Sequence, residues 1–238
     1  MIEHFVQSAS TYSADIDFVI ELIFWIVGVW FVLTEGVFFW LLFRFRKTSD
    51  EQKAQYIQGT EPEFVRWVTW PHFLILVCDV FILVFAVKVW VNVKQELPEP
   101  DASVAIVSQQ WAWSFVHEGP DGELGTVDDI TMVDELHIEV DKTYHYILTS
   151  EDVVHSFSVP VFRLKQDAVP GREITGWFEA TQTGEFGIQC AEMCGIGHGI
   201  MAARIFIETP EEHRAWVAAH SSVAELDTDD APSRHSED

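Results

Sequence analysis

The 26-residue stretch FVIELIFWIVGVWFVLTEGVFFWLLF, residues 18–43, sets the architecture of the chain because it is almost wholly apolar. Its only charged residues are Glu21 and Glu35, and about 20 apolar residues are enough to cross the hydrocarbon core of a bilayer. A second stretch, residues 67–93, has the same character. We therefore predict two transmembrane helices at these positions, which make residues 1–94 a membrane anchor.

Both predicted spans carry carboxylates where a lipid-facing side chain would be apolar. Glu21 and Glu35 are separated by close to a whole number of helical turns, so they share one face of the first helix. Asp79 lies inside the second span. Because an unpaired carboxylate in lipid is costly, we expect these faces to meet other protein, which makes the chain one subunit of a larger membrane complex. The alternative is that each carboxyl group is protonated or reaches a membrane interface.

The distribution of basic residues predicts the orientation of the spans. The N-terminal tail has no Lys or Arg, whereas the loop between the spans and its flanks carry Arg44, Arg46, Lys47, Lys53 and Arg66. The positive-inside rule places this loop in the cytoplasm. We therefore expect an integral protein of the plasma or inner membrane, with both termini and the C-terminal half on the outer, positive face.

The C-terminal half has the pattern of an all-β domain. Residues 95–102 contain two prolines and three acidic residues, which predicts an exposed linker. Short runs rich in Val, Ile, Phe, Tyr and Thr then predict strands at 103–108, 110–116, 130–140, 143–149, 153–159, 173–180, 184–190 and 201–208. Strands so spaced, without helices between them, favour an antiparallel sandwich or barrel over residues 103–208.

The segment 209–238 predicts a short helix followed by an acidic tail. Thr209, Pro210 and Glu212 are residue types that cap and begin a helix, which we expect over residues 210–220. Residues 221–238 are rich in Ser, Asp and Glu, so we expect them to be disordered.

The loop CAEMCGIGHGIM, residues 190–201, carries the chemistry of the chain. Cys190, Cys194, His198 and Met201 place two thiols, an imidazole and a thioether within one short segment. Thiolate and thioether sulfur are soft ligands, and together with histidine they favour copper. Glycines between these ligands supply the backbone freedom to turn several side chains onto one point: Gly195, Gly197 and Gly199.

Four kinds of site remain open from the residues alone. A disulfide between Cys190 and Cys194 would leave His198 and Met201 unexplained, and zinc has little use for methionine. A mononuclear blue-copper site would combine Cys194, His198 and Met201 with the upstream His155, but would leave Cys190 without a role. A centre of two copper ions bridged by two thiolates uses every one of these residues.

Several segments together resemble subunit II of the haem–copper cytochrome c oxidases. They are the metal loop 190–201, His155 in VVHSF, the two-helix anchor, QWAWS at 110–114 and LKQDAVPGR at 164–172. The resemblance extends over nearly the whole chain and preserves the order of its segments. It implies a cupredoxin-like Greek-key domain that holds the dinuclear copper centre called CuA.

The resemblance also implies a role for each residue of the copper site. Cys190 and Cys194 would bridge both ions. His155 and His198 would each bind one ion, and Met201 would be a weak ligand.

Further roles follow from the same resemblance. The backbone carbonyl of Glu192 would be another weak copper ligand, and its side chain would reach a magnesium or manganese ion at the boundary with subunit I. Trp111 would be the point where electrons enter, although its alternation with Trp113 leaves a place in the core as the alternative. Many members of the family carry a glutamate just before the second span, at the entrance to a proton path. Glu61 and Glu63 lie near this position but neither falls squarely on it, so a role of Glu63 in proton uptake is a hypothesis.

The function implied is that of the electron-input subunit of a terminal oxidase. Cytochrome c or an equivalent small carrier would reduce the copper centre, and haem in subunit I would then receive the electron for reduction of oxygen to water with proton pumping. Subunits I and III are the expected partners, and the chain alone is an electron-transfer module. The alternatives are the electron-input subunit of a CuA-containing nitric oxide reductase and a membrane-anchored copper-binding or copper-delivery protein.

The chain is strongly acidic, with 38 Asp and Glu against 14 Lys and Arg. This balance excludes nucleic-acid binding, which needs a basic surface. Residues 95–238 hold most of the acidic excess, which is larger than the docking of a cationic cytochrome c needs. We favour a salt-adapted, halophile-type surface, on which high salt would screen electrostatic steering.

Overall fold

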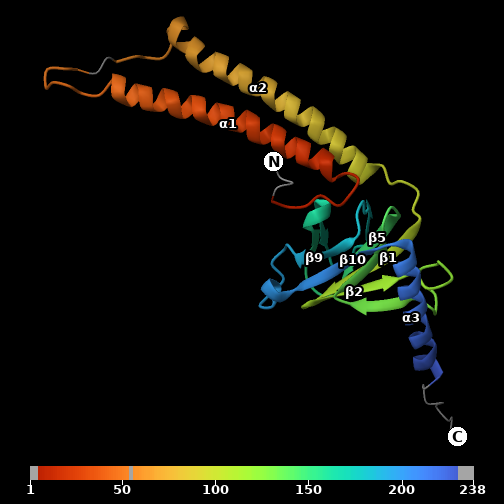
Figure 1. Ribbon diagram of the computed structural model, residues 1–238. Coiled ribbons are helices and arrows are strands. Elements are labelled where there is room, and N and C mark those ends of the chain that lie inside the picture. The colour runs from red at the N-terminus through yellow and green to blue at the C-terminus, as the bar shows by residue number, and fades with distance from the viewer. Residues whose placement is uncertain (1–4, 54–55, 230–238) are drawn as a thin grey trace. The chain divides into compact units, whose positions relative to one another are not determined.

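The computed structural model describes residues 5–53 and 56–229 (Figure 1). These residues fall into two compact units. One is a helical unit, residues 15–91, and the other combines the short segment 5–14 with residues 92–229.

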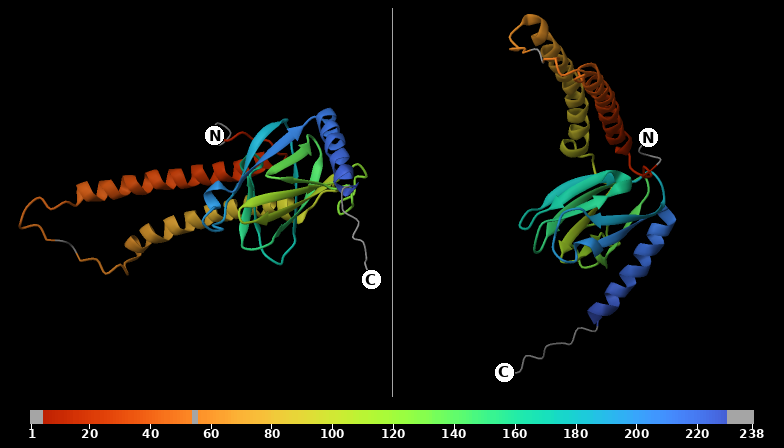
Figure 2. Two further views of the ribbon diagram at one scale, coloured as in Figure 1. Left: turned by 90° about the horizontal axis from the view of Figure 1, so that it is seen from below. Right: turned by 90° about the vertical axis from the view of Figure 1, so that its left-hand side faces the viewer.

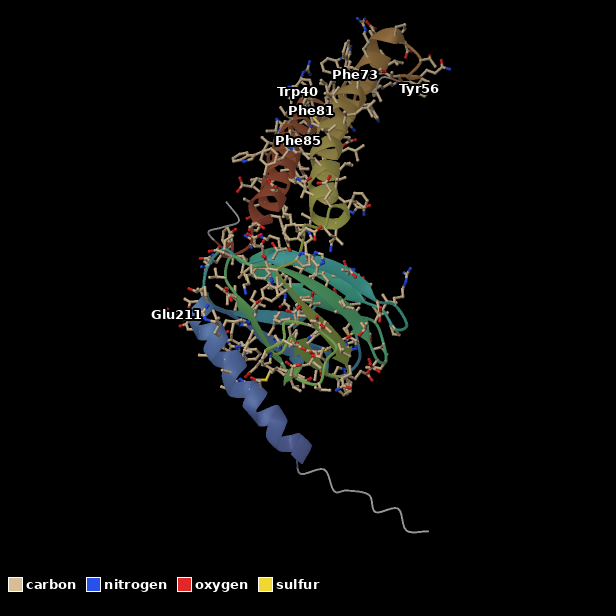
Figure 3. All side chains as sticks on the ribbon, turned by 90° about the vertical axis from the view of Figure 1, so that its right-hand side faces the viewer. Trp40, Tyr56, Phe73, Phe81, Phe85 and Glu211 are labelled. Carbon is tan, nitrogen blue, oxygen red and sulfur yellow. The ribbon has the colours of Figure 1, made fainter. Side chains whose placement is uncertain are left out.

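The helical unit consists of α1 (Ser13–Arg44) and α2 (Pro62–Trp90), and α2 continues into one π-helical turn, η2 (Val91–Gln95). Both helices are long and apolar enough to cross a membrane, by length and composition. Their side chains project outward along most of their length (Figure 3), and the rings of Phe18 and Phe85 meet between the helices at 5.2 Å. Each helix begins before its apolar run, with Asp15 in the first turn of α1 and with Pro62 and Glu63 at the start of α2.

The second unit is built on two five-stranded sheets, which we call the β domain. The first sheet has the order β3 (Ile130–Val133), β2 (Ala112–His117), β1 (Ala102–Gln109), β5 (Thr143–Ser150), β8 (Ile174–Glu179). The second has the order β4 (Glu135–Glu139), β10 (Ala202–Glu208), β9 (Gly184–Cys190), β6 (His155–Val159), β7 (Leu164–Ala168). The sheets face each other across a core of alternate side chains, such as Ile106, Trp113 and Phe157 (Figure 2).

The predicted fold class, two long helices followed by an all-β cupredoxin-like sandwich, is confirmed. The sheets are mixed, however, and not purely antiparallel. β1 pairs with β5 in parallel, and β4 pairs with β10 in parallel. Alternation of side chains along a strand does not reveal the direction of its neighbour, so sequence alone could not show this.

The predicted strand 130–140 is two strands that belong to different sheets. Asp134 separates β3 from β4 and has φ +59°, a left-handed conformation that turns the chain. Its carboxylate accepts the backbone N–H of Trp113 at 2.9 Å, and its own N–H donates to the Trp113 carbonyl at 2.8 Å. These bonds hold the crossing point between the sheets.

Two further elements differ from the prediction. The sequence does not predict β7, because LKQDA is largely polar, and among the described strands β7 pairs with β6 alone at the edge of its sheet. The C-terminal helix α3 runs over Pro210–Asp229, beyond the predicted 210–220 and into the segment expected to be disordered. The rest of that expected tail, 230–238, lies outside the described residues.

The start of α3 follows the predicted capping. The Thr209 hydroxyl accepts the backbone N–H of Glu212 at 3.3 Å, and the Glu212 carboxylate accepts the backbone N–H of Thr209 at 2.9 Å. This reciprocal pair satisfies two N–H groups that a helix terminus leaves free. α3 lies along one side of the β domain (Figure 2).

A short N-terminal segment also belongs to this unit. Ser10 forms an antiparallel bridge with Ala180, and Thr181 donates its backbone N–H to the carbonyl of Ala9 at 3.0 Å. The ring of Tyr12 packs edge-on against Trp177 at 5.1 Å. Residues before the first long helix therefore complete the β domain.

Candidate metal centre

The candidate metal centre lies where two strands of the second sheet end. His155 opens β6, Cys190 closes β9, and the loop 191–201 leads into β10. The pairing of β6 with β9 sets Phe157 opposite Cys190, which brings His155 to the same end of the sheet. The ligand atoms of His155, Cys190 and Cys194 all lie within 4.8 Å of one another, and all three residues are buried.

The two thiols face each other at the centre of this cluster. The Sγ atoms of Cys190 and Cys194 are 3.7 Å apart, and both cysteines are free. Metal–thiolate bonds are about 2.3 Å long, so one ion can contact both sulfurs when they lie within about 4.6 Å. The arrangement is therefore suited to bridging a metal, and it is not the disulfide that the sequence left open.

The remaining soft donors surround the thiols. His198 Nδ1 lies 3.6 Å from the Cys194 sulfur. The Met201 sulfur lies 3.8 Å from the Cys194 sulfur and 3.1 Å from His155 Nδ1. The structure thus brings together all the side chains predicted as copper ligands, from one loop and one distant strand.

Glu192 contributes through its backbone. Its carbonyl oxygen lies 3.3 Å from the Cys190 sulfur, while the residue itself is exposed. The carbonyl is therefore directed at the cluster, and the carboxylate is available for other contacts.

The second nitrogen of His155 is held by Asp152. Nε2 lies 2.9 Å from the Asp152 carboxylate, which also accepts the backbone N–H of Gln110 at 2.7 Å. Because Nε2 donates to this carboxylate, Nδ1 is the nitrogen that faces the thiols and Met201. Burial alone would raise the pKa of Asp152, but hydrogen bonds from His155, Gln110 and Val153 outweigh it and lower that pKa.

Binding of a metal ion at the thiols is coupled to the loss of a proton. Burial, reinforced by the neighbouring Cys190, raises the pKa of Cys194 to about 11. A metal ion must therefore displace the thiol proton when it binds, and the charge of the ion then compensates the buried thiolate.

The two tryptophans of QWAWS have separate environments. Trp113 is fully buried in the core, with its ring 5.5 Å from Phe157. Trp111 is 37 % exposed, and its Nε1 lies 3.4 Å from the carbonyl oxygen of Cys194. Trp113 is thus the core residue of the pair, whereas Trp111, for which a core position was the alternative, lies at the surface against the metal loop.

Sequence reasoning missed the apolar rim of the loop. Met193 and Ile196 are 73 % and 96 % exposed, and Ile200 is exposed as well. Large apolar residues in a Gly-rich surface loop were the available signal.

Sequence reasoning also missed a cluster of three histidines, His117, His137 and His213, where α3 meets the β domain. His137 and His213 each donate Nδ1–H to the carboxylate of Glu208, at 2.7 and 2.9 Å. His117 accepts the backbone N–H of His137 at 3.0 Å, and burial lowers the pKa of His117 to about 3. The ring of Trp216 from α3 stacks on His137 at 4.4 Å, so the cluster joins the helix to the second sheet.

The carboxylates considered for proton uptake lie in the helical unit. Glu61 occupies the N-cap position of α2, and its carboxylate accepts the backbone N–H of Gly59 at 3.1 Å. Glu63 lies in the first turn of the same helix.

Comparisons with known proteins agree with this picture. Residues 102–209 match the family model described as "Cytochrome C oxidase subunit II, periplasmic domain". The chain is 32 % identical over 235 residues to the alternative cytochrome c oxidase subunit 2 of Bradyrhizobium diazoefficiens, with 89 % of this chain and 82 % of that one covered. It is 29 % identical over 245 residues to cytochrome c oxidase subunit 2 of Cereibacter sphaeroides, with 90 % and 78 % covered.

Among solved structures, the crystal structure of the periplasmic domain of subunit II (CoxB) of Bradyrhizobium japonicum matches with a TM-score of 0.48 and 29 % identity. The match covers 54 % of this chain and 99 % of that one.

Proposed function

The chain belongs to the cytochrome c oxidase subunit II family, and from this we propose that it is the electron-input subunit of a terminal oxidase. In this proposal it accepts electrons from cytochrome c at a dinuclear copper centre and passes them to haem in subunit I. Oxygen is reduced to water there, coupled to proton pumping.

One observation carries the proposal: two free thiols 3.7 Å apart are surrounded by two imidazoles, a thioether and a backbone carbonyl. This donor set is soft, and it is the set that suits copper better than zinc. When bound, a copper pair would supply a one-electron redox couple that needs no proton.

Each residue of the metal centre then has a definite role. Cys190 and Cys194 would hold both ions, and His155 and His198 would each hold one. Burial of the cysteines and His155 keeps water from the donors, and Asp152 fixes the orientation of the His155 ring. His155 and Cys190 lie at strand ends, and the loop that carries the other donors joins β9 to β10, which favours a rigid site suited to electron exchange without rearrangement.

Trp111 is proposed as the contact for the electron donor. Its ring is partly exposed, and its N–H group lies beside the carbonyl of a proposed copper ligand, Cys194. The exposed apolar residues Met193 and Ile196 would extend this contact surface.

Other parts of the proposal concern the assembled complex. The exposed carboxylate of Glu192 would bind a magnesium or manganese ion shared with subunit I. The two apolar helices would place the β domain on the outer face of the membrane, as the basic loop between them indicates. A role of Glu63 in proton uptake would be excluded if Glu63→Gln left turnover and proton pumping unchanged.

The test uses the chain assembled with its oxidase partners. Two copper ions per chain and a seven-line hyperfine pattern in electron paramagnetic resonance are expected. One copper and a four-line pattern would instead indicate a blue-copper site, and a labile signal without hyperfine delocalisation would indicate a copper-delivery protein.

The cysteines offer a matched control. Cys190→Ser or Cys194→Ser should abolish the seven-line signal and turnover with cytochrome c. Cys78→Ser, which makes the same chemical change in α2, should retain both. Full turnover in either loop variant would refute the proposal.

A further inference from the structure

We propose that Gly197 is a positioning residue: its missing side chain provides the space in which the Trp111 indole lies, and this placement sets the rate at which the copper centre accepts electrons from a protein donor. This inference rests on the proposed function. It adds a residue that binds neither metal nor donor.

The first argument is steric. A Cβ atom built on Gly197 would lie 2.6 Å from Cγ and 2.8 Å from Cε3 of Trp111, and closer still to Cδ2. Carbon atoms pack at about 3.5–4.0 Å, so the ring would have to move by about 1 Å. These atoms belong to the rigid body of the indole, which cannot give way as a flexible chain end could.

The second argument separates space from backbone conformation. Gly197 has φ −88° and ψ 5°, which residues other than glycine can adopt. Gly195, in contrast, has φ +124°, so a side chain there would be strained whatever the space. The nearest obstacle to a side chain at position 197 is therefore the Trp111 ring, and not the backbone conformation.

The third argument identifies what the placement achieves. With the ring in this position, Trp111 Nε1 lies 3.4 Å from the Cys194 carbonyl oxygen, and the Gln110 side chain donates to the same oxygen at 2.8 Å. The indole thus reaches the peptide group of a residue whose sulfur lies in the thiol cluster. A ring displaced by about 1 Å loses this contact.

The matched control lies two residues away. A Cβ atom on Gly199 would meet nothing within 4 Å, and its φ lies outside the left-handed range. Gly199→Ala therefore makes the same chemical change in the same loop without touching the indole.

The electron step is simple to balance. The reduced haem of the protein donor loses one electron, the copper centre gains it, and no bond or proton is exchanged. A small soluble reductant delivers the same electron without docking on Trp111, so the two reductants separate docking geometry from the state of the copper centre.

The experiment compares wild type, Gly197→Ala, Gly199→Ala, Trp111→Ala and the double variant Gly197→Ala/Trp111→Ala in the assembled oxidase. Copper content and electron paramagnetic resonance are recorded first. Stopped-flow absorbance then gives the rate of copper reduction by reduced cytochrome c and by ascorbate with a mediator.

We expect Gly197→Ala to keep two coppers and the seven-line signal, and to slow reduction by cytochrome c by about tenfold, which is less than the roughly 100-fold that a 1 Å misplacement of reacting groups can cost. Reduction by ascorbate, and both rates in Gly199→Ala, should be unchanged. In the Trp111→Ala background, Gly197→Ala should add no further loss, because no ring remains to be displaced.

Two results would overturn the inference: a wild-type rate in Gly197→Ala, or an equal slowing by Gly197→Ala in the presence and absence of Trp111. If Gly197→Ala lost copper, recovery of copper in the double variant would support the steric clash, and loss in both would refute it. Absence of a dinuclear signal in the wild type would instead refute the proposed function.

Discussion

Replacing Glu208 by Gln should loosen α3 from the β domain. Glu208 ends β10, and its two carboxylate oxygens accept hydrogen bonds from His137 of β4 and His213 of α3. Its side chain is only 16 % exposed. Glutamine keeps the size of the side chain but removes its charge and one of its two acceptors, so one histidine N–H is left unpaired.

The size of the effect follows from the pKa of Glu208. Burial alone would raise this pKa, but the hydrogen bonds and charges of His137 and His213 outweigh burial and lower the pKa from 4.5 to about 2. A shift of this size corresponds to about 3 kcal/mol at most. Solvent screening at this partly exposed site reduces the expected loss of stability to about 1–2 kcal/mol.

The measurement is hydrogen exchange of peptides from residues 210–220 in the detergent-solubilised full chain. At pH 6, Glu208→Gln should speed exchange by about 5- to 30-fold. Glu211→Gln makes the same change at an exposed position of α3 (Figure 3) and should behave as wild type.

The pH dependence follows from the direction of the shift. A carboxyl group whose pKa is lowered by folding stabilises the fold fully above its unfolded value of about 4.5, and this contribution is lost as the pH falls toward about 2. After correction for intrinsic exchange, the gap between wild type and Glu208→Gln should therefore narrow below pH 4.5. Equal protection of the two proteins at pH 6 would refute this account of the cluster.

Three further substitutions test other contacts. Asp152→Asn removes the charge that orients His155 and should weaken copper binding by about 10- to 100-fold in chelator competition; unchanged affinity would contradict the role of the carboxylate. Thr209→Ala removes the N-cap of α3 and should cost about 1 kcal/mol, seen as faster exchange in that helix alone. Gly176→Ala would push a methyl group into the ring and hydroxyl of Tyr146 and should destabilise the chain by about 1–3 kcal/mol in urea unfolding, whereas an unshifted midpoint would show that the ring can move aside.

The spans and the metal loop could be predicted because their signals are local. A run of apolar residues identifies α1 without reference to the rest of the chain, and Cys190, Cys194 and His198 lie within one turn-rich segment. From the residues alone, His155 was only one possible upstream ligand, since it is the pairing of β6 with β9 that brings it to the loop.

The features that escaped prediction depend on contacts between distant positions. The carboxylate of Glu208 meets His137, which lies 71 residues earlier, and neither residue type indicates the other. At Asp134 the chain passes from the first sheet to the second, although the sequence 130–140 has the pattern of one strand. The conformation of Asp134 is fixed by its hydrogen bonds with Trp113 on a neighbouring strand. Gly197 is conspicuous in the sequence, but its requirement for space is visible only once the Trp111 ring is in place.

The bridge between Ser10 and Ala180 constrains how the protein can be assembled. Residues 9–11 and the strands beyond residue 101 form one folded unit, although two helices long enough to cross a bilayer separate them in the chain. A polypeptide that crosses a bilayer twice returns to the side from which it started. Residues 9–11 and the strands beyond residue 101 can pair only if the number of crossings between them is even. If the first helix failed to insert, residues 9–11 would stay on the other side of the bilayer, and Ala180 and Thr181 would be left without their partners. The β domain would then expose an unpaired edge that is prone to aggregation.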